Sequence, residues 1–197
     1  MNLRFQYNKI SQLQLIKQLG VRQKALPTLK NKESALRLEV KRARDTATEL
    51  DAKIRDRTLE LDAFMKLWGE FDSSLISIKQ VEIKTRKIAG VKTPLLADIM
   101  YHTQPFNLFT APSWFLDGIV MLKELSKLRI EREVYIRKMH ILEQVRKKTT
   151  QKVNLYEKVQ IPAFEEAILR IKRFLEDEEN LSKAAQKILK NRLEASQ

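Results

Sequence analysis

Cysteine is absent from the 197-residue sequence, and it holds only four glycines and five prolines. The lack of cysteine excludes disulfides and thiolate chemistry, and it fits a reducing cytoplasm. Few helix-breaking residues together with a charged fraction of 32% are typical of long helices. No run of about 18 apolar residues occurs, and residues 1–10 lack the apolar core of a signal peptide. We therefore expect a helical cytosolic chain with no membrane span of its own.

The sequence also lacks recognisable active-site motifs. It contains no phosphate-binding loop of the form GxxxxGK[ST] and no Gly-x-Ser-x-Gly motif. Neither of the two histidines, His102 and His140, forms an i, i+4 pair with another strong metal ligand. We expect a non-enzymatic protein with no catalytic, cofactor-binding or metal-binding residues, and no requirement for a cofactor.

The formal net charge is +13, and two segments carry the excess. Residues 1–60 hold 14 Lys and Arg against 7 Asp and Glu, and residues 121–160 hold 11 against 5. Residues 61–120 and 161–197 are balanced. This distribution fits an anionic partner such as nucleic acid, lipid or an acidic protein surface. It equally fits a basic, solvated helix surface, because acidic residues are interleaved throughout.

A heptad pattern dominates the N-terminal 78 residues. Nineteen positions follow steps of four and three without a break, and sixteen of them are apolar. Such a stripe forms the seam of a coiled coil. We expect Glu33 and Arg57 to set the register through partners on the facing helix. The seam comprises Leu15, Leu19, Arg22, Leu26, Leu29, Glu33, Leu36, Val40, Ala43, Ala47, Leu50, Ile54, Arg57, Leu61, Phe64, Trp68, Phe71, Leu75 and Ile78.

The pattern changes to period two after Lys79. Residues 81–86 alternate apolar and polar and predict a strand, with residues 95–100 as the returning strand. Gly90 and Pro94 predict the intervening turn. Because an isolated hairpin is marginally stable, we expect these residues to lean on the aromatic end of the helices or on another protein.

A second helical pattern begins at Ser113, an expected N-cap. Its seam shifts by one residue between Tyr156 and Ile161. The fold class expected is all-α: a long antiparallel two-helix coiled coil with a small β-hairpin-containing foot. Residues 1–78 form the N-terminal shaft helix, residues 79–113 the foot and residues 114–197 the C-terminal shaft helix of a single domain. A helix pair with these ends places Pro27 opposite Pro162.

Three stretches resemble one family, the D subunit of V-type and A-type rotary ATPases, and their order and spacing fit across nearly the whole chain. Leu29-Lys30-Asn31-Lys32, followed by Leu36, resembles the family pattern LLKxKRDxL, although Glu33 stands where Arg is usual. Residues 88–94, Ile-Ala-Gly-Val-Lys-Thr-Pro, resemble NvMGVKvP. Residues 152–162, Lys-Val-Asn-Leu-Tyr-Glu followed by Ile161-Pro162, resemble RRVNALExxxIP.

The resemblance implies a central-stalk rotor shaft that couples ATP hydrolysis or synthesis in a catalytic head to ion translocation through a membrane ring. The implied partners are the A and B subunits of the head hexamer, the small F subunit of the rotor and the C subunit that caps the ring. The chain would then lie peripherally on the cytoplasmic face of a prokaryotic membrane, reach the membrane only through the complex, and bind no nucleic acid. The implied head interface comprises Leu29, Lys30, Lys32, Val153, Asn154, Glu157, Ile161 and Pro162. The implied foot interface comprises Val81, Ile83, Gly90, Val91 and Pro94.

Two alternatives stay open. The chain could be a basic coiled-coil scaffold or nucleic-acid-binding protein, for which a salt-dependent affinity for DNA or RNA would be diagnostic. It could also correspond to the gamma shaft of F-type ATPases. That shaft carries a larger α/β domain between its helices, and a foot of 35 residues is too short to supply one.

Overall fold

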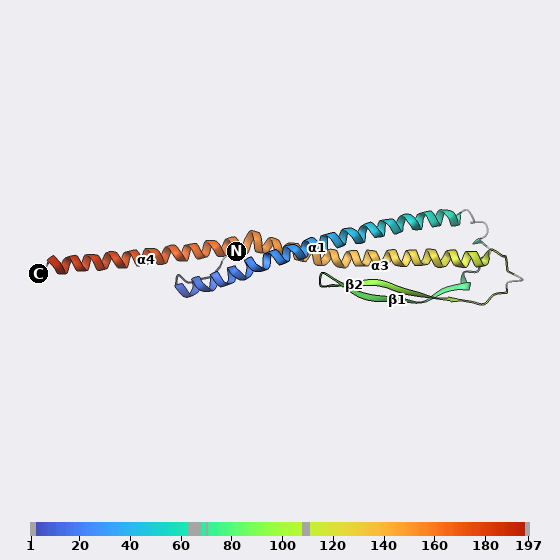
Figure 1. Ribbon diagram of the computed structural model, residues 1–197, viewed down its shortest axis with the longest axis horizontal. Helices are drawn as coiled ribbons and strands as arrows, with labels where there is room; N and C mark the ends of the chain where they lie inside the picture. The colour runs from blue at the N-terminus through green and yellow to red at the C-terminus, as the bar shows by residue number, and fades with distance from the viewer. Residues whose placement is uncertain (1–2, 63–67, 70, 108–110, 196–197) are drawn as a thin grey trace. The chain divides into compact units, whose positions relative to one another are not determined.

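The computed structural model describes residues 3–62, 68–69, 71–107 and 111–195. Two long helices pack antiparallel and a two-stranded antiparallel hairpin accompanies them (Figure 1), which confirms the expected fold class. The chain divides into two compact units, Met1–Glu33 with Lys148–Gln197, and Ser34–Lys147. The elements in chain order are α1 (Lys9–Asp62), the 3-10 turn η1 (Ser73–Leu75), β1 (Ile76–Ile88), β2 (Val91–Thr103), α3 (Phe115–Asn154), the π-helical turn η2 (Leu155–Gln160) and α4 (Ile161–Ala195).

In the unit formed by residues 34–147, α1 packs on α3 along the predicted seam. Five consecutive seam positions are buried, from Leu36 to Leu50. The small side chains of Ala43 and Ala47 lie in the middle of this stretch, where they permit close approach of the two helices. Val134 and Leu142 of α3 are buried as well, and Leu142 packs with Leu36 and Val40. The heptad of α1 is therefore confirmed as a packing seam.

The hairpin lies alongside α3 in this unit (Figure 1). Its two-residue turn is Ala89-Gly90, with φ of 48° and 80°, a pairing of positive angles typical of a type I′ turn. The first residue after the turn, Val91, is buried against Leu36, Val40 and Leu142. The turn of the hairpin is thus held against the middle of the helices, a long-range contact that the sequence pattern did not predict.

Three predicted boundaries in this unit were wrong. The first helix does not reach residue 78, because α1 is described over Lys9–Asp62 and β1 begins at Ile76, ahead of the expected strand. Pro94 lies within β2, where it pairs with Thr85, and not in the turn. Ile78 fits a heptad and a period-two strand equally well, and the strand is the structure adopted. The predicted seam residue Phe64 lies outside the described residues.

Aromatic rings pack together where the strands and α3 begin. Trp68 lies 5.6 Å from Trp114 and Phe71 lies 5.3 Å from Phe115, measured between ring centroids. Gly118 of α3 lies beneath this cluster, since a Cβ added to it would be 3.3 Å from Trp114 and 3.4 Å from Trp68 and Phe71.

The unit formed by residues 1–33 and 148–197 has a separate core. Leu15 of α1 packs with Phe164, Ala167 and Ile171 of α4. The N-terminal segment adds to this core, because Leu3 and Phe5 pack on the cluster and the Tyr7 ring lies 5.0 Å from that of Phe174. No sequence pattern indicated a role for this segment.

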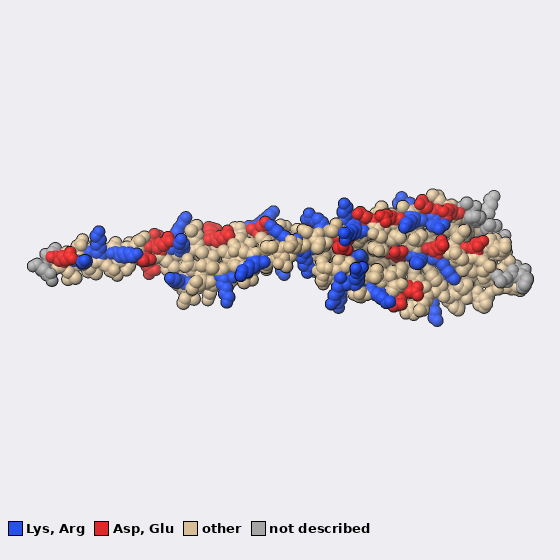
Figure 2. Space-filling model, in the orientation of Figure 1, with Lys and Arg blue, Asp and Glu red and all other residues tan. Residues whose placement is uncertain are grey.

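Charged side chains are scattered over the face shown in Figure 2, and Lys and Arg are frequent near the turn of the hairpin. Within the part of the chain that the structure describes, no helix is both long enough and apolar enough to cross a membrane.

Candidate functional site

The site begins with the π-helical turn η2, which separates α3 from α4. Its hydrogen bonding is shown by the backbone N–H of Ile161, which donates to the carbonyl of Tyr156, five residues back. A π turn takes up one more residue than an α-helical turn, so the residues after it are displaced by one in the seam. The phase shift between Tyr156 and Ile161 in the sequence is therefore the signature of η2.

Pro162 follows the π turn directly, in the first turn of α4. In a regular α-helix a proline removes one hydrogen bond and its ring clashes with the carbonyl four residues earlier. The wider π turn disturbs the regular spacing at the carbonyl of Lys158, the group that Pro162 would otherwise meet. We infer that η2 serves two purposes: it accommodates Pro162 and brings Phe164 into the core.

Several side-chain contacts join α1 to the second helical stretch around η2. Lys30 Nζ lies 2.6 Å from Glu157 Oε1, and Arg22 Nε donates to Gln160 Oε1 at 2.7 Å. The Arg22 guanidinium also lies 4.4 Å from the centre of the Phe164 ring. Arg22 is thus a seam residue with two partners on the facing helix.

A further contact involves a buried acidic residue. Glu33 is 9% exposed, and its Oε1 accepts a hydrogen bond from the Thr150 hydroxyl at 3.2 Å. The adjacent Thr149 is buried as well. A buried carboxylate with a facing hydroxyl fixes the register of a helix pair. The expected register role of Glu33 is supported by this partner, whereas the two threonines had not been identified from the sequence.

The first and third family stretches therefore meet in space, within one unit. Lys30 and Glu157 are about half exposed and pair with each other. Val153 is buried, whereas Leu29 and Ile161 are half-buried. The remaining implied head residues have exposed side chains: Lys32, Asn154 and Pro162. The implied head residues thus fall into a buried or half-buried group and an exposed group.

Polar side-chain contacts indicate the register around η2. Gln160 contacts Arg22, and Glu165 Oε1 accepts a hydrogen bond from Gln23 Nε2 at 3.4 Å. The residues that flank Pro162 contact Arg22 and Gln23, whereas Lys30 contacts Glu157, so the expectation that Pro27 lies almost opposite Pro162 stays a prediction.

The implied foot residues lie on the hairpin. Val81 is half-buried and Ile83 is 48% exposed. Gly90 has the positive φ that its turn position requires, and Pro94 is half-buried on β2. Val91 differs from the others because its side chain is buried in the core of its own chain, where a partner could not reach it.

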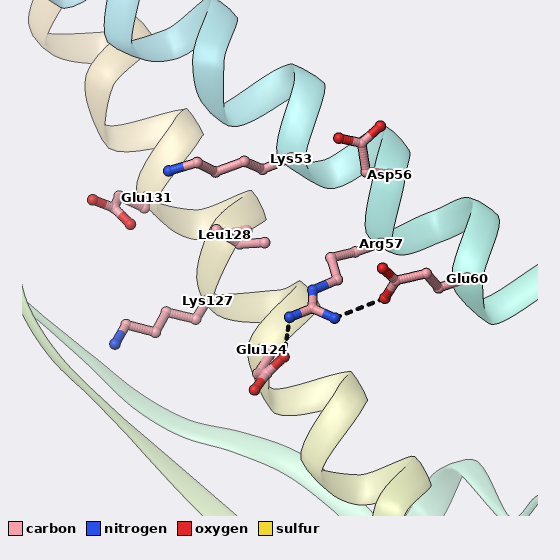
Figure 3. Close-up of a pocket in the computed structure, with 8 residues that line it drawn as sticks. All are labelled: Lys53, Asp56, Arg57, Glu60, Glu124, Lys127, Leu128 and Glu131. Carbon is pink, nitrogen blue, oxygen red and sulfur yellow. Dashed lines mark hydrogen bonds and ion pairs between the residues drawn. The ribbon is translucent and has the colours of Figure 1, made fainter.

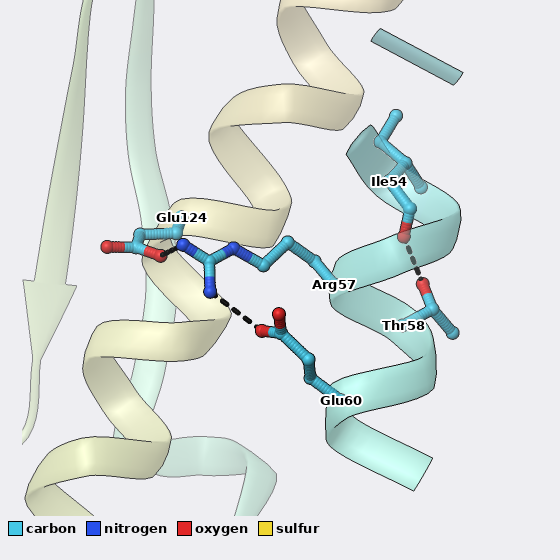
Figure 4. A network of polar contacts seen from close by, with 5 residues as sticks. All are labelled: Ile54, Arg57, Thr58, Glu60 and Glu124. Carbon is cyan, nitrogen blue, oxygen red and sulfur yellow. Dashed lines mark hydrogen bonds and ion pairs between the residues drawn. The ribbon is translucent and has the colours of Figure 1, made fainter. Parts of the chain in front are cut away.

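A polar groove lies between α1 and α3 in the unit of residues 34–147 (Figure 3). Its cavity volume is about 520 Å³, and four carboxylates and three cations line it around Leu128. The Arg57 guanidinium lies 2.7 Å from Glu60 on its own helix and 3.5 Å from Glu124 on α3 (Figure 4). The hydrogen bond with Glu60 raises the pKa of Arg57. Arg57 therefore has the cross-helix partner expected of a register residue.

None of these arrangements supplies a metal centre. The described residues contain no group of three or more His, Asp or Glu side chains placed to hold a metal ion. The polar links described above join the two helical stretches and hold their register.

Comparisons with known proteins identify one family over most of the chain, including both stretches. The family model for the D subunit of ATP synthases matches residues 11–191. A protein of Borreliella burgdorferi, named as the D subunit of a V-type ATP synthase, is 29% identical over 171 residues, which cover 85% of this chain and 84% of that protein. Proteins of the same name from Chlamydia muridarum and Chlamydia pneumoniae are 29% and 27% identical, each over 174 residues and 86% of this chain, and the alignments cover 86% and 83% of those proteins. The chain belongs to the D subunit family of ATP synthases.

Proposed function

We propose that this chain is the central-stalk rotor shaft of a V/A-type rotary ATPase. It couples ATP hydrolysis or synthesis in the catalytic head to ion translocation through the membrane ring. The proposal rests on the contact between residues 29–33 and residues 149–162, which an ion pair and a hydrogen bond join around η2. We call these two segments together the layer. Two family stretches far apart in the sequence thus form one structural feature.

The head interface is assigned to the outward-facing members of this layer, Lys32, Asn154 and Pro162, with the half-exposed pair Lys30 and Glu157 beside them. The proposed partners are the A and B subunits of the head. The buried members of the layer, which include Val153, position this surface and do not touch the partner. The chain transmits torque through its packing, and it is not itself catalytic.

The small F subunit of the rotor is assigned to the hairpin, at the exposed side chain of Ile83 and the adjoining Val81, Gly90 and Pro94. Exposed apolar side chains on a sheet of two strands favour a protein partner. Val91 is omitted from this interface because it anchors the hairpin to its own helices. The ring-capping C subunit joins the shaft to the membrane ring, so the chain lies peripherally on the cytoplasmic face.

The test is affinity purification of the tagged chain from native membranes, with identification of the proteins that co-purify. The wild-type chain is expected to recover the A, B, F and C subunits. The variant Val81→Asp with Ile83→Asp is expected to lose the F subunit while its helical circular dichroism is preserved. Met100→Asp introduces a charge at a half-exposed residue of β2 and serves as the control. Recovery of the F subunit by the double variant at the wild-type level would refute the hairpin assignment.

A further inference from the structure

A second cleft opens beside the turn of the hairpin, in the unit of residues 34–147. Its cavity volume is about 440 Å³, and α1, β1 and α3 all contribute to its lining. Four of the lining side chains are cationic: Arg42 of α1, Arg86 and Lys87 of β1, and Lys138 of α3. Among the described residues the only acidic one in the lining is Glu39, so the lining carries a formal net charge of +3.

The packing of the hairpin creates this concentration of charge. Val91 anchors the turn against Leu36, Val40 and Leu142, and the Thr93 hydroxyl donates to the backbone carbonyl of Arg86 at 3.0 Å. These contacts hold the end of β1 beside the two helices, although it is distant from them in the sequence. Arg86 and Lys87 are thereby fixed next to the cations of α1 and α3.

The cations are only partly neutralised within the cleft. Arg42 lies 2.8 Å from Glu39 on the same helix. Lys138 Nζ lies 5.4 Å from the centre of the Tyr135 ring, a contact that leaves its positive charge in place. No ion pair with Arg86 or Lys87 is found within the described residues. An anionic ligand would supply the missing charge.

The limited extent of the positively charged lining limits the size of that ligand. The groove farther along the same helix pair, shown in Figure 3, is lined by four carboxylates and three cations. The positive lining of the cleft therefore does not continue into that groove, and an extended polyanion would meet carboxylates there. A compact ligand with several negative oxygens matches a small basic cleft that contains arginine.

We propose that this cleft binds a small anion that carries two or more adjacent phosphate groups. Arg42 and Arg86 provide planar donors for phosphate oxygens, and Lys87 and Lys138 provide point charges beside them. The apolar part of the lining is small, with Ala43 and Ile88 as its aliphatic members. Lys138 lies 5.4 Å from the centre of the Tyr135 ring, the aromatic member of the lining, so the cleft recognises chiefly the phosphates. This site is independent of the shaft assignment.

The test is isothermal titration calorimetry of the full chain with sodium tripolyphosphate at low ionic strength. One ligand is expected to bind per chain, with an affinity that falls as salt is added. Arg86→Gln with Lys87→Gln is expected to weaken binding at least about tenfold, which corresponds to about 1.4 kcal/mol. The matched control is Lys79→Gln with Lys84→Gln, which removes the same charge from β1 outside the cleft and should change affinity by less than about threefold.

Two further arms distinguish other ligands. ATP is expected to bind no more tightly than tripolyphosphate, and a short polyglutamate peptide is expected to compete poorly.

Lys138→Gln, on α3, should weaken binding even if the hairpin double variant folds poorly, which circular dichroism will reveal. Equal weakening by the control pair would show diffuse charge attraction and overturn the proposal. Absence of saturable binding, or equal affinity for polyglutamate, would overturn it as well.

Discussion

The π turn gives the sharpest prediction, because its two inferred purposes can be separated by deleting one residue. Val159 lies in η2 and is 40% exposed, so its own packing contribution is small. Deletion of Val159 converts the turn to regular α-helix while α4 keeps the same face toward α1. Pro162 then enters a regular helix, where it costs about 3 kcal/mol relative to alanine. Deletion of Val159 alone should therefore lower the free energy of unfolding by about that amount.

Addition of Pro162→Ala to this deletion should restore stability to within about 1 kcal/mol of Pro162→Ala alone, since neither the proline clash nor a register error remains. The control deletes Glu166, an exposed residue of α4, in the same Pro162→Ala background. At least one of Phe164 and Ile171, which are 1% and 0% exposed, must then leave the core. Loss of a large buried side chain costs roughly 2 to 5 kcal/mol.

Urea unfolding followed by circular dichroism measures all four variants. The reasoning would be refuted by equal destabilisation from the two deletions in the Pro162→Ala background. It would also be refuted if deletion of Val159 alone left stability unchanged, because the proline would then need no π turn.

Three other changes test local features. Ala89→Asn should raise the free energy of unfolding by about 0.5 to 1 kcal/mol, because asparagine tolerates the positive φ of 48° better than alanine; an unchanged urea midpoint would contradict this. Gly118→Leu should lower it by roughly 1 to 3 kcal/mol through overpacking of the aromatic cluster, with a change in the fluorescence of the two tryptophans; a native spectrum and stability would argue against the cluster. Arg146 donates hydrogen bonds to Glu143 and thereby lowers the pKa of that carboxyl in the folded state. The ionised Glu143 therefore stabilises the folded chain fully above its unfolded pKa of about 4.3, and this stabilisation is lost as the pH falls through the lower, folded pKa. Glu143→Gln should reduce the stability difference between pH 7 and pH 3, measured by thermal unfolding, and an identical pH profile would contradict the assignment.

The periodic features of the fold were predictable from the sequence. The heptad identified α1, and the one-residue shift after Tyr156 marked the position of η2, although its π geometry needed the structure. The end of α1 was missed because Ile78 satisfies helix and strand periodicities alike. Periodicity reports which face of an element is apolar and does not report which distant residues cover that face.

For the candidate site as well, the sequence identified individual residues but not the contacts between them. The two family stretches pointed to Lys30 and Glu157 separately, and only the fold reveals that they form an ion pair. The anchoring of Val91 by Leu36 and Leu142 is a contact between residues distant in sequence. No local pattern encodes such a contact, so the position of the hairpin, and the cleft that depends on it, required the structure.

The absence of cysteine from the chain permits the most direct test of the proposed shaft function. A single cysteine is introduced at the exposed Asn154, labelled with a photoreactive maleimide and reconstituted into the complex. A second variant carries the label at Ile83. The account predicts that illumination joins the label at Asn154 to the A or B subunit and the label at Ile83 to the F subunit. Cross-links in the reverse arrangement, or none to the head from Asn154 in a complex that hydrolyses ATP, would contradict it.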